Sequence, residues 1–244
     1  TEIRKKNSSF FVAMISKIFE KYIYNHVDLS TSVSQFEKKK INKLFKSNPI
    51  IFPNIVEIEN DKSIKNIKKF SKYVFYCGSY LYKPNKIIID NLVKKIMPKV
   101  RKKNREIELV LTGTETKGFN EKWIHNIGHI SKKKFISILK SSICIAVPSQ
   151  EGYGTRVKII EALCYGGIIL TTPIGIEGIR FNKDSPSPIV CKDLNKFSDE
   201  ILKLYKKHSF IKKSIKKEIK NYCDMYSAKT ASKKLYDLLV NKYL

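Results

Sequence analysis

The chain has 244 residues, of which 42% are hydrophobic and 11% aromatic, so it can bury a sizeable core and disorder is not expected. The apolar run from Phe10 to Ile15 is followed by Lys17 and is too short for a membrane helix or a secretory signal. The first residue is Thr1 rather than Met, which favours a fragment whose natural start lies upstream.

The net charge of +26 comes mainly from lysine, because only five of the 48 basic residues are arginine. A nucleic-acid-binding protein more often uses arginine forks on phosphates and base edges, arranged in one stripe with aromatic residues. Here the lysines are spread along every predicted helix. We interpret them first as solvated helix faces, second as attraction to an anionic membrane surface, and last as a nucleic-acid site.

Cysteine and histidine give no sign of a metal centre. The five cysteines are odd in number and contain no Cys-x-x-Cys pair, which indicates a reducing, cytosolic compartment. His125 and His129 are four residues apart in a predicted strand, too far apart to chelate one ion.

The first third of the chain predicts a small helical unit followed by a linker. Residues 8–25 carry apolar side chains at the spacing of one helix face. A lysine-rich helix is predicted over 35–46, followed by an apolar run that ends at Pro53. Residues 57–70 are polar and lysine-rich, and they predict a linker or a surface helix.

From Tyr73 onwards, short apolar runs alternate with helical patterns, which predicts an α/β fold with a doubly wound parallel sheet. The predicted strands are 73–77, 107–112, 143–148 and 167–172. The predicted helices are 86–103, 131–142, 155–165, 195–207, 209–221 and 228–242.

Ligands of such sheets bind at the carboxyl ends of the strands. The segment from Ser149 to Leu163 leads from one of these ends into a helix, and its glycines allow a close backbone approach. Thr155 is the predicted N-cap. Arg156 and Lys158 place two cations at the positive end of the helix dipole, a conflict that a bound anion would remove. A diphosphate fits this arrangement.

Glu161 lies one turn into the same predicted helix. It shares a face with Lys158 and Tyr165, whereas Val157, Ile160 and Cys164 form the predicted apolar stripe. Its carboxylate is placed to accept hydrogen bonds from sugar or ribose hydroxyls. A surface ion pair between Lys158 and Glu161 explains the spacing equally well, and both interpretations stay open.

These residues carry a resemblance to a known family. Gly154-Thr155-Arg156-x-Lys158-x-x-Glu161, then Gly166-Gly167, then Gly175-x-Glu177-Gly178 resembles the donor-site signature of family 4 and related retaining glycosyltransferases. Val74–Asn85, Leu109–Gly113 and Ile127–Ile130 resemble earlier segments of the same domain, in the same order. The resemblance covers roughly residues 26–242.

The resemblance implies a GT-B fold, in which two Rossmann-like domains face a cleft. Arg156 and Lys158 would act in catalysis by stabilising the diphosphate, with no metal and no cofactor beyond a nucleotide-diphosphate sugar as donor. Many relatives have a Glu-x7-Glu pair, but Tyr153 stands at its first position, so Glu151 is the candidate for the sugar contact. The other implied donor-binding residues are Gly78, Ser79, Gly113, His129, Gly154, Thr155, Glu161, Gly175 and Glu177.

The implied domains are a remnant of the acceptor domain (1–56), a linker (57–72), a nucleotide-sugar-binding domain (73–225) and a crossover helix (226–244). The implied function is transfer of a sugar, with retention, to a glycan or lipid-linked acceptor in cell-surface polysaccharide synthesis. We expect a cytoplasmic protein, peripheral at the inner face of the membrane, that does not bind nucleic acid. The alternative is a non-catalytic nucleotide-binding module or an inactive fragment.

Overall fold

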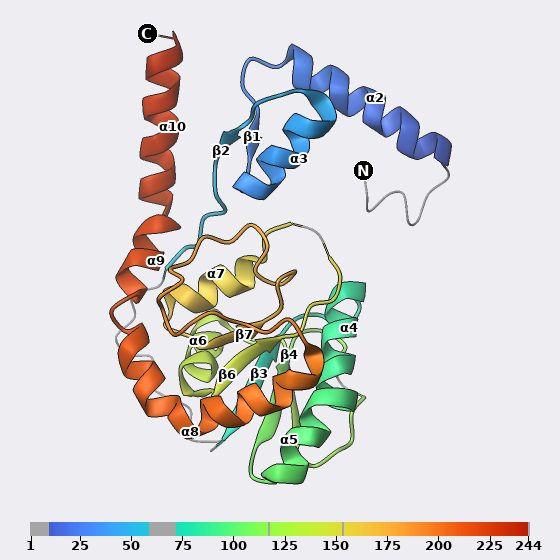
Figure 1. Cartoon of the computed structure of the whole chain (residues 1–244), viewed down its shortest axis with the longest axis vertical. Helices are drawn as coiled ribbons and strands as arrows, with labels where there is room; N and C mark the ends of the chain where they lie inside the picture. Colours follow the sequence, from blue (N-terminus) through green and yellow to red (C-terminus); the bar gives the residue numbers. More distant parts are fainter. Residues whose placement is uncertain (1–9, 59–71, 117, 153, 244) are drawn as a thin grey trace.

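The computed structural model describes residues 10–58, 72–116, 118–152 and 154–243. Its centre is a six-stranded, fully parallel sheet in the order β5-β4-β3-β6-β7-β8 (Figure 1). The strands are β3 (Tyr73–Cys77), β4 (Glu108–Thr112), β5 (Ile124–Gly128), β6 (Cys144–Val147), β7 (Ile169–Thr171) and β8 (Ile189–Val190). The prediction of a doubly wound parallel sheet is confirmed, although β8 was not predicted and β5 was expected only as the strand that carries His125.

The strands are buried because their side chains are apolar on both faces. Val74, Phe75, Leu109, Val110 and Ala146 are completely buried, as parallel strands covered on both sides require. Within the sheet, the chain runs from β3 outward through β4 to β5. It then crosses back to β6, which pairs with β3, and continues outward through β7 to β8 on the other side. The strand order therefore reverses between β3 and β6.

The helix predicted over 86–103 is continuous but contains a π-helical turn. It comprises α4 (Lys83–Asn91), η1 (Leu92–Ile96) and α5 (Met97–Lys103), and it starts earlier than predicted because Pro84 occupies the first turn. Pro98 has no N–H to donate, and the wider π turn lies directly before it. Helix α6 (Lys132–Ser141) connects β5 to β6, and helix α7 (Val157–Cys164) connects β6 to β7.

The predicted break near residue 208 is wrong, because α8 (Phe197–Ile215) is one helix. Apolar residues continue through it at spacings of three and four, with Ile201, Leu204, Ile211 and Ile215 all buried. The helix then gives way to α9 (Ile219–Met225) and α10 (Ala228–Tyr243).

Helix α8 passes beneath the amino ends of the strands (Figure 1). His208 Nε2 lies 3.0 Å from the carbonyl oxygen of Ser142, just before β6, and Lys212 Nζ donates to the carbonyl oxygen of Gly166 at 3.1 Å, just before β7. Helix α8 therefore covers the amino ends of the strands, and the predicted ligand site lies at their carboxyl ends.

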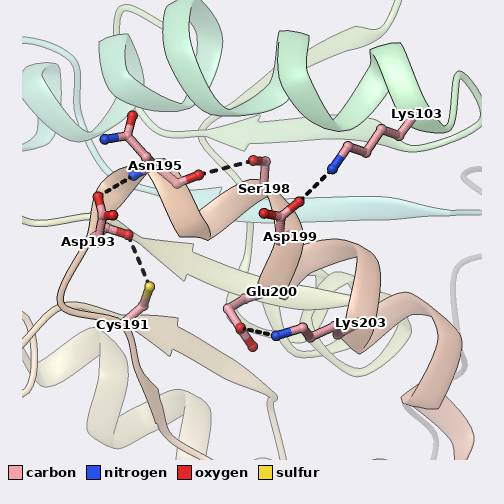
Figure 2. A network of polar contacts seen from close by, with 8 residues as sticks. All are labelled: Lys103, Cys191, Asp193, Asn195, Ser198, Asp199, Glu200 and Lys203. Carbon is pink, nitrogen blue, oxygen red and sulfur yellow. Dashed lines mark hydrogen bonds and ion pairs between the residues drawn. The ribbon is translucent and has the colours of Figure 1, made fainter.

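A polar network fixes the start of α8 (Figure 2). The Cys191 thiol donates to the Asp193 carbonyl oxygen at 3.1 Å, and the Asp193 side chain accepts from the backbone N–H of Asn195 at 2.8 Å. Lys103 pairs with Asp199 at 2.7 Å and so joins the end of α5 to the first turn of α8. The network fixes the short connection from the edge strand β8 to α8, which includes the 3-10 helix η2 (Leu194–Lys196).

The N-terminal unit contains α2 (Phe10–His26), β1 (Thr31–Ser32), α3 (Gln35–Phe45) and β2 (Ile50–Ile51). The two strands pair in parallel, so β1-α3-β2 is a small βαβ unit. Helix α10 reaches this unit, because Lys234 Nζ donates to the Ile51 carbonyl oxygen at 2.9 Å. Helix α2 leaves Phe11, Ile18 and Phe19 outward and more than 60% exposed. Residues 59–71 of the predicted linker lie outside the described residues.

The helices that the structure describes include none long and apolar enough to span a bilayer. All five cysteines are free thiols.

Lys212 makes the stability of this fold depend on pH. Burial lowers the pKa of Lys212 to about 8, from 10.5. The unfolded state therefore binds one more proton between these two values, so the free energy of unfolding rises with pH across this window. Across the whole window, the free energy of unfolding rises by on the order of 3 kcal/mol.

We expect the free energy of unfolding of the wild type, relative to that of Lys212→Met, to increase between pH 7 and pH 10. Urea unfolding measures this difference. Lys213 is exposed on the same helix, so Lys213→Met is the matched control for the loss of one charge. A difference for Lys212→Met that does not vary with pH would contradict the prediction.

Candidate functional site

A cavity of about 330 Å³ lies where the carboxyl ends of β3 and β6 meet. This is the point at which the strand order reverses, the usual ligand position in an open parallel sheet. The cavity is lined by Tyr76, Tyr82, Pro84, Asn85, Ile88, Val147, Gly152, Thr155, Arg156 and Lys158. Three predicted site residues (Thr155, Arg156 and Lys158) therefore lie in one cavity.

Arg156 joins two loops at the mouth of this cavity. Its guanidinium donates to the carbonyl oxygen of Ile174 at 2.7 Å and to that of Glu151 at 3.1 Å. Gly152 makes room for it, since a Cβ at this glycine would lie 3.0 Å from Nη2 of Arg156. Burial lowers the pKa of Arg156, and the nearby Glu177 partly opposes the shift. The guanidinium of Arg156 thus hydrogen-bonds to the backbone of both the loop after β6 and the loop after β7.

Lys158 points across the cavity to the end of β3. Its Nζ lies 2.8 Å from the Cys77 carbonyl oxygen, 3.1 Å from Asn85 Oδ1 and 3.3 Å from the Tyr76 hydroxyl. Burial lowers the pKa of Lys158. All three acceptors are neutral, so no carboxylate of the described residues lies within hydrogen-bond distance of the ammonium.

Glu161 makes an ion pair with Lys132 at the start of α6, and not with Lys158. The surface-pair interpretation of Lys158 and Glu161 is therefore wrong, because the two side chains face different neighbours. Lys132 was not identified from the sequence, since the residue is 29 positions away in a lysine-rich stretch without a distinguishing pattern.

The predicted N-cap is also wrong. Helix α7 begins after Arg156, which has extended backbone angles and makes no side-chain cap bond. The Thr155 hydroxyl is buried without a hydrogen-bond partner among the described residues. In the predicted apolar stripe, Ile160 and Cys164 are buried, but Val157 is 43% exposed. Tyr165, predicted on the face of Lys158 and Glu161, is buried at 6%.

Gly78 and Gly113 allow close packing around the cavity. A Cβ at Gly78 would lie 2.8 Å from the side-chain amide of Asn85, and a Cβ at Gly113 would lie 2.4 Å from the Gly78 carbonyl oxygen. The adjacent Ser79 hydroxyl accepts from Thr114 Oγ1 at 2.5 Å. These contacts hold the turns after β3 and β4 together.

The remaining predicted residues lie around this centre. Gly175 is buried, and its N–H donates to Thr172 Oγ1 at 3.0 Å. His129 is exposed in the loop after β5, and Gly154 is exposed beside the cavity mouth. A Cβ at Gly154 would lie 3.8 Å from Glu37 Oε1, so the start of α3 faces the same loops. Tyr153 lies outside the described residues.

Two cavity residues, Tyr76 and Asn85, were not singled out as site residues from the sequence. Tyr76 is fully buried near the end of an apolar strand, where a hydroxyl needs a partner. Asn85 directly follows Pro84 at the start of a helix. A polar group at the carboxyl end of a central strand is the signal that could have identified Tyr76.

Gly113 gives a direct stability test of the turn. Gly113→Ala combines a φ of 126° with a Cβ 2.4 Å from the Gly78 carbonyl oxygen, and we expect a loss of about 3 kcal/mol or more in urea unfolding. Gly128→Ala is the matched control, because Gly128 has a φ of 74° with nothing within 4 Å; we expect about 1 kcal/mol. Equal losses in the two variants would show that the close approach contributes nothing.

More than half of the chain matches the model of a known protein family. The family model described as Glycosyl transferases group 1 matches residues 71–207, a range that includes all six strands of the central sheet. No curated protein matches the chain significantly by sequence.

Solved structures share the fold at low sequence identity. A mutant of S. aureus TarM in complex with Fondaparinux, alpha-GlcNAc-glycerol and UDP is 20% identical, with a TM-score of 0.70 over 90% of this chain and 46% of that chain. Anabaena Alr3699/HepE in complex with UDP-glucose is 10% identical, with a TM-score of 0.65 over 93% of this chain and 68% of that chain. The chain thus spans about half the length of the TarM and GtfA structures that it matches.

Proposed function

The chain belongs to the group 1 glycosyltransferases, and on that premise we propose that its cavity binds a nucleoside-diphosphate sugar and serves sugar transfer. One observation carries the proposal: Arg156 and Lys158 border the same cavity and, among the described residues, donate only to neutral acceptors. Two partly desolvated cations for which the described part of the chain offers no carboxylate within hydrogen-bond distance favour an anion between them. A diphosphate supplies that charge.

The same cations suit the transfer step. When the bond between the sugar C1 and the β-phosphate oxygen breaks, the electron pair stays on that oxygen and negative charge grows on the diphosphate. Cations that are already fixed by protein acceptors stabilise this charge without reorganising. Interactions that strengthen as the charge develops accelerate the reaction. We propose on this basis that Arg156 and Lys158 act without a metal ion.

The finer parts of the proposal concern donor and acceptor. We propose that Glu161 binds ribose hydroxyls, that the exposed loop at His129 contacts the base, and that Glu151, Gly175 and Glu177 lie near the sugar. Resemblance to family 4 supports transfer with retention to a glycan or lipid-linked acceptor in cell-surface polysaccharide synthesis. We propose a cytoplasmic setting, with lysine-rich surfaces favouring contact with anionic lipid.

A second candidate is a non-catalytic nucleotide-binding module. It rests on the same cavity, because a site that binds a diphosphate does not by itself require transfer of the sugar. The two candidates predict the same diphosphate binding. Hydrolysis or transfer of a radiolabelled donor sugar separates them, since the module binds the donor and releases it unchanged.

We expect a nucleoside diphosphate to raise the melting temperature of the chain in a titration with UDP, GDP and ADP. Arg156→Ala and Lys158→Ala should each weaken the binding by about tenfold or more, because each removes a charged donor. Lys206 is exposed on α8, which lies at the amino ends of the strands and not at the cavity. Lys206→Ala is therefore the control for the loss of one positive charge. Absence of any shift at millimolar nucleotide would refute the proposed donor site.

The role of Glu161 has its own test. If its carboxylate accepts hydrogen bonds from ribose, the wild type should bind the ribonucleoside diphosphate more tightly than its 2′,3′-dideoxy analogue. Glu161→Gln should reduce that preference by about fivefold, since a neutral acceptor is weaker than a charged one. Lys132→Ala is the comparison variant, because it removes the partner of Glu161 and leaves the carboxylate. An unchanged preference in Glu161→Gln would exclude the ribose contact.

A further inference from the structure

The ammonium of Lys158 is held by a polar network from the end of β3 and the start of α4. Asn85 is its centre: the Asn85 Oδ1 atom accepts from the Tyr76 hydroxyl at 2.8 Å and from Lys158 Nζ at 3.1 Å. Its Nδ2 atom donates to the Ser79 carbonyl oxygen at 3.0 Å. The Ser79 carbonyl oxygen can only accept, so the amide is oriented with its oxygen towards Lys158.

The surroundings leave Asn85 little freedom. Gly78 has no side chain, and the Asn85 amide fills the space that a Cβ would take, 2.8 Å away. Pro84 precedes Asn85 in the first turn of α4 and fixes the local backbone. The orientation of the Asn85 carbonyl is therefore set by packing on one side and by two hydrogen bonds on the other.

An ammonium has three N–H donors, and Lys158 has three acceptors. The shorter contacts are with the Cys77 carbonyl oxygen and with Asn85. The contact with the Tyr76 hydroxyl is the longest at 3.3 Å, and that hydroxyl already donates its own proton to Asn85. It is the contact that costs least to give up when a charged acceptor enters the cavity.

We infer that Asn85 is a positioning residue for Lys158: Asn85, together with the Cys77 carbonyl, holds the ammonium in place while its third N–H passes from the Tyr76 hydroxyl to a diphosphate oxygen. This inference rests on the proposed diphosphate site. The neutral amide matters, because it fixes the lysine without neutralising it. A carboxylate at the same position would hold the lysine equally well and would repel the diphosphate.

The test uses two substitutions of similar size with opposite expected effects. Asn85→Asp places a negative charge against Lys158 and should raise the pKa of the lysine, whereas Asn85→Leu removes an acceptor and should lower it. The measurement is the pH dependence of Lys158 acylation by acetic anhydride, quantified by mass spectrometry in the full chain. We expect midpoints about one pH unit above and below that of the wild type, respectively.

Nucleotide binding is the second readout. Asn85→Asp and Asn85→Leu should both weaken the diphosphate that binds the wild type by about tenfold, whereas Tyr76→Phe should change its affinity by less than about threefold. Asn104→Asp is the matched charge control, because Asn104 follows α5 at the opposite edge of the sheet. Melting curves by circular dichroism verify that each variant is folded.

The outcomes separate the two proposals. Acylation midpoints that do not move in either Asn85 variant would overturn the positioning role, whatever the nucleotide does. Shifted midpoints in a protein that binds no nucleoside diphosphate would overturn the proposed donor site and, with it, the handover to a diphosphate. A loss in Tyr76→Phe as large as in Asn85→Leu would overturn the handover from the Tyr76 hydroxyl.

Discussion

The parallel pairing of β3 with β6, in which Val74 lies opposite Cys144 and Phe75 opposite Ile145, determines where this protein can bind a ligand. The connections from these two central strands run in opposite directions, so no helix closes over their carboxyl ends. The turn after β3 and the loop after β6 diverge there and leave a cavity. Glycines at both loops bring backbone close to the opening, and α8 closes the other edge of the sheet.

The charges at this opening differ from the rest of a very basic surface. Some cations elsewhere have a carboxylate partner, as Lys103 has Asp199 and Lys132 has Glu161. At the cavity, Arg156 and Lys158 are oriented by carbonyl, amide and hydroxyl oxygens, which fix a cation without cancelling it. The site therefore combines a fixed geometry with two cations whose hydrogen-bond acceptors, among the described residues, are all neutral. Net charge alone did not reveal this difference, because it depends on which acceptors the fold brings to each cation.

The sequence predicted the architecture well, because periodic apolar runs and the turn-rich segment after Val147 act locally. It failed where distant segments meet. The partner of Glu161 is on another helix, the cap of α7 is shifted from Thr155 to Arg156, and the continuity of α8 depends on packing beneath the sheet. Asn85 and Tyr76 enter the site only because β3 and α4 adjoin α7. No local pattern encodes such a meeting of three elements.

The position of β3 in the sheet also has a consequence during synthesis. Its neighbour β4 follows within about 35 residues, whereas its other neighbour, β6, is made some 70 residues after β3. On a chain emerging from the ribosome, one long edge of an aromatic, apolar strand stays open throughout that interval. Such edges promote association between nascent chains. A strongly positive chain repels its own copies, so a net charge of +26 opposes such association.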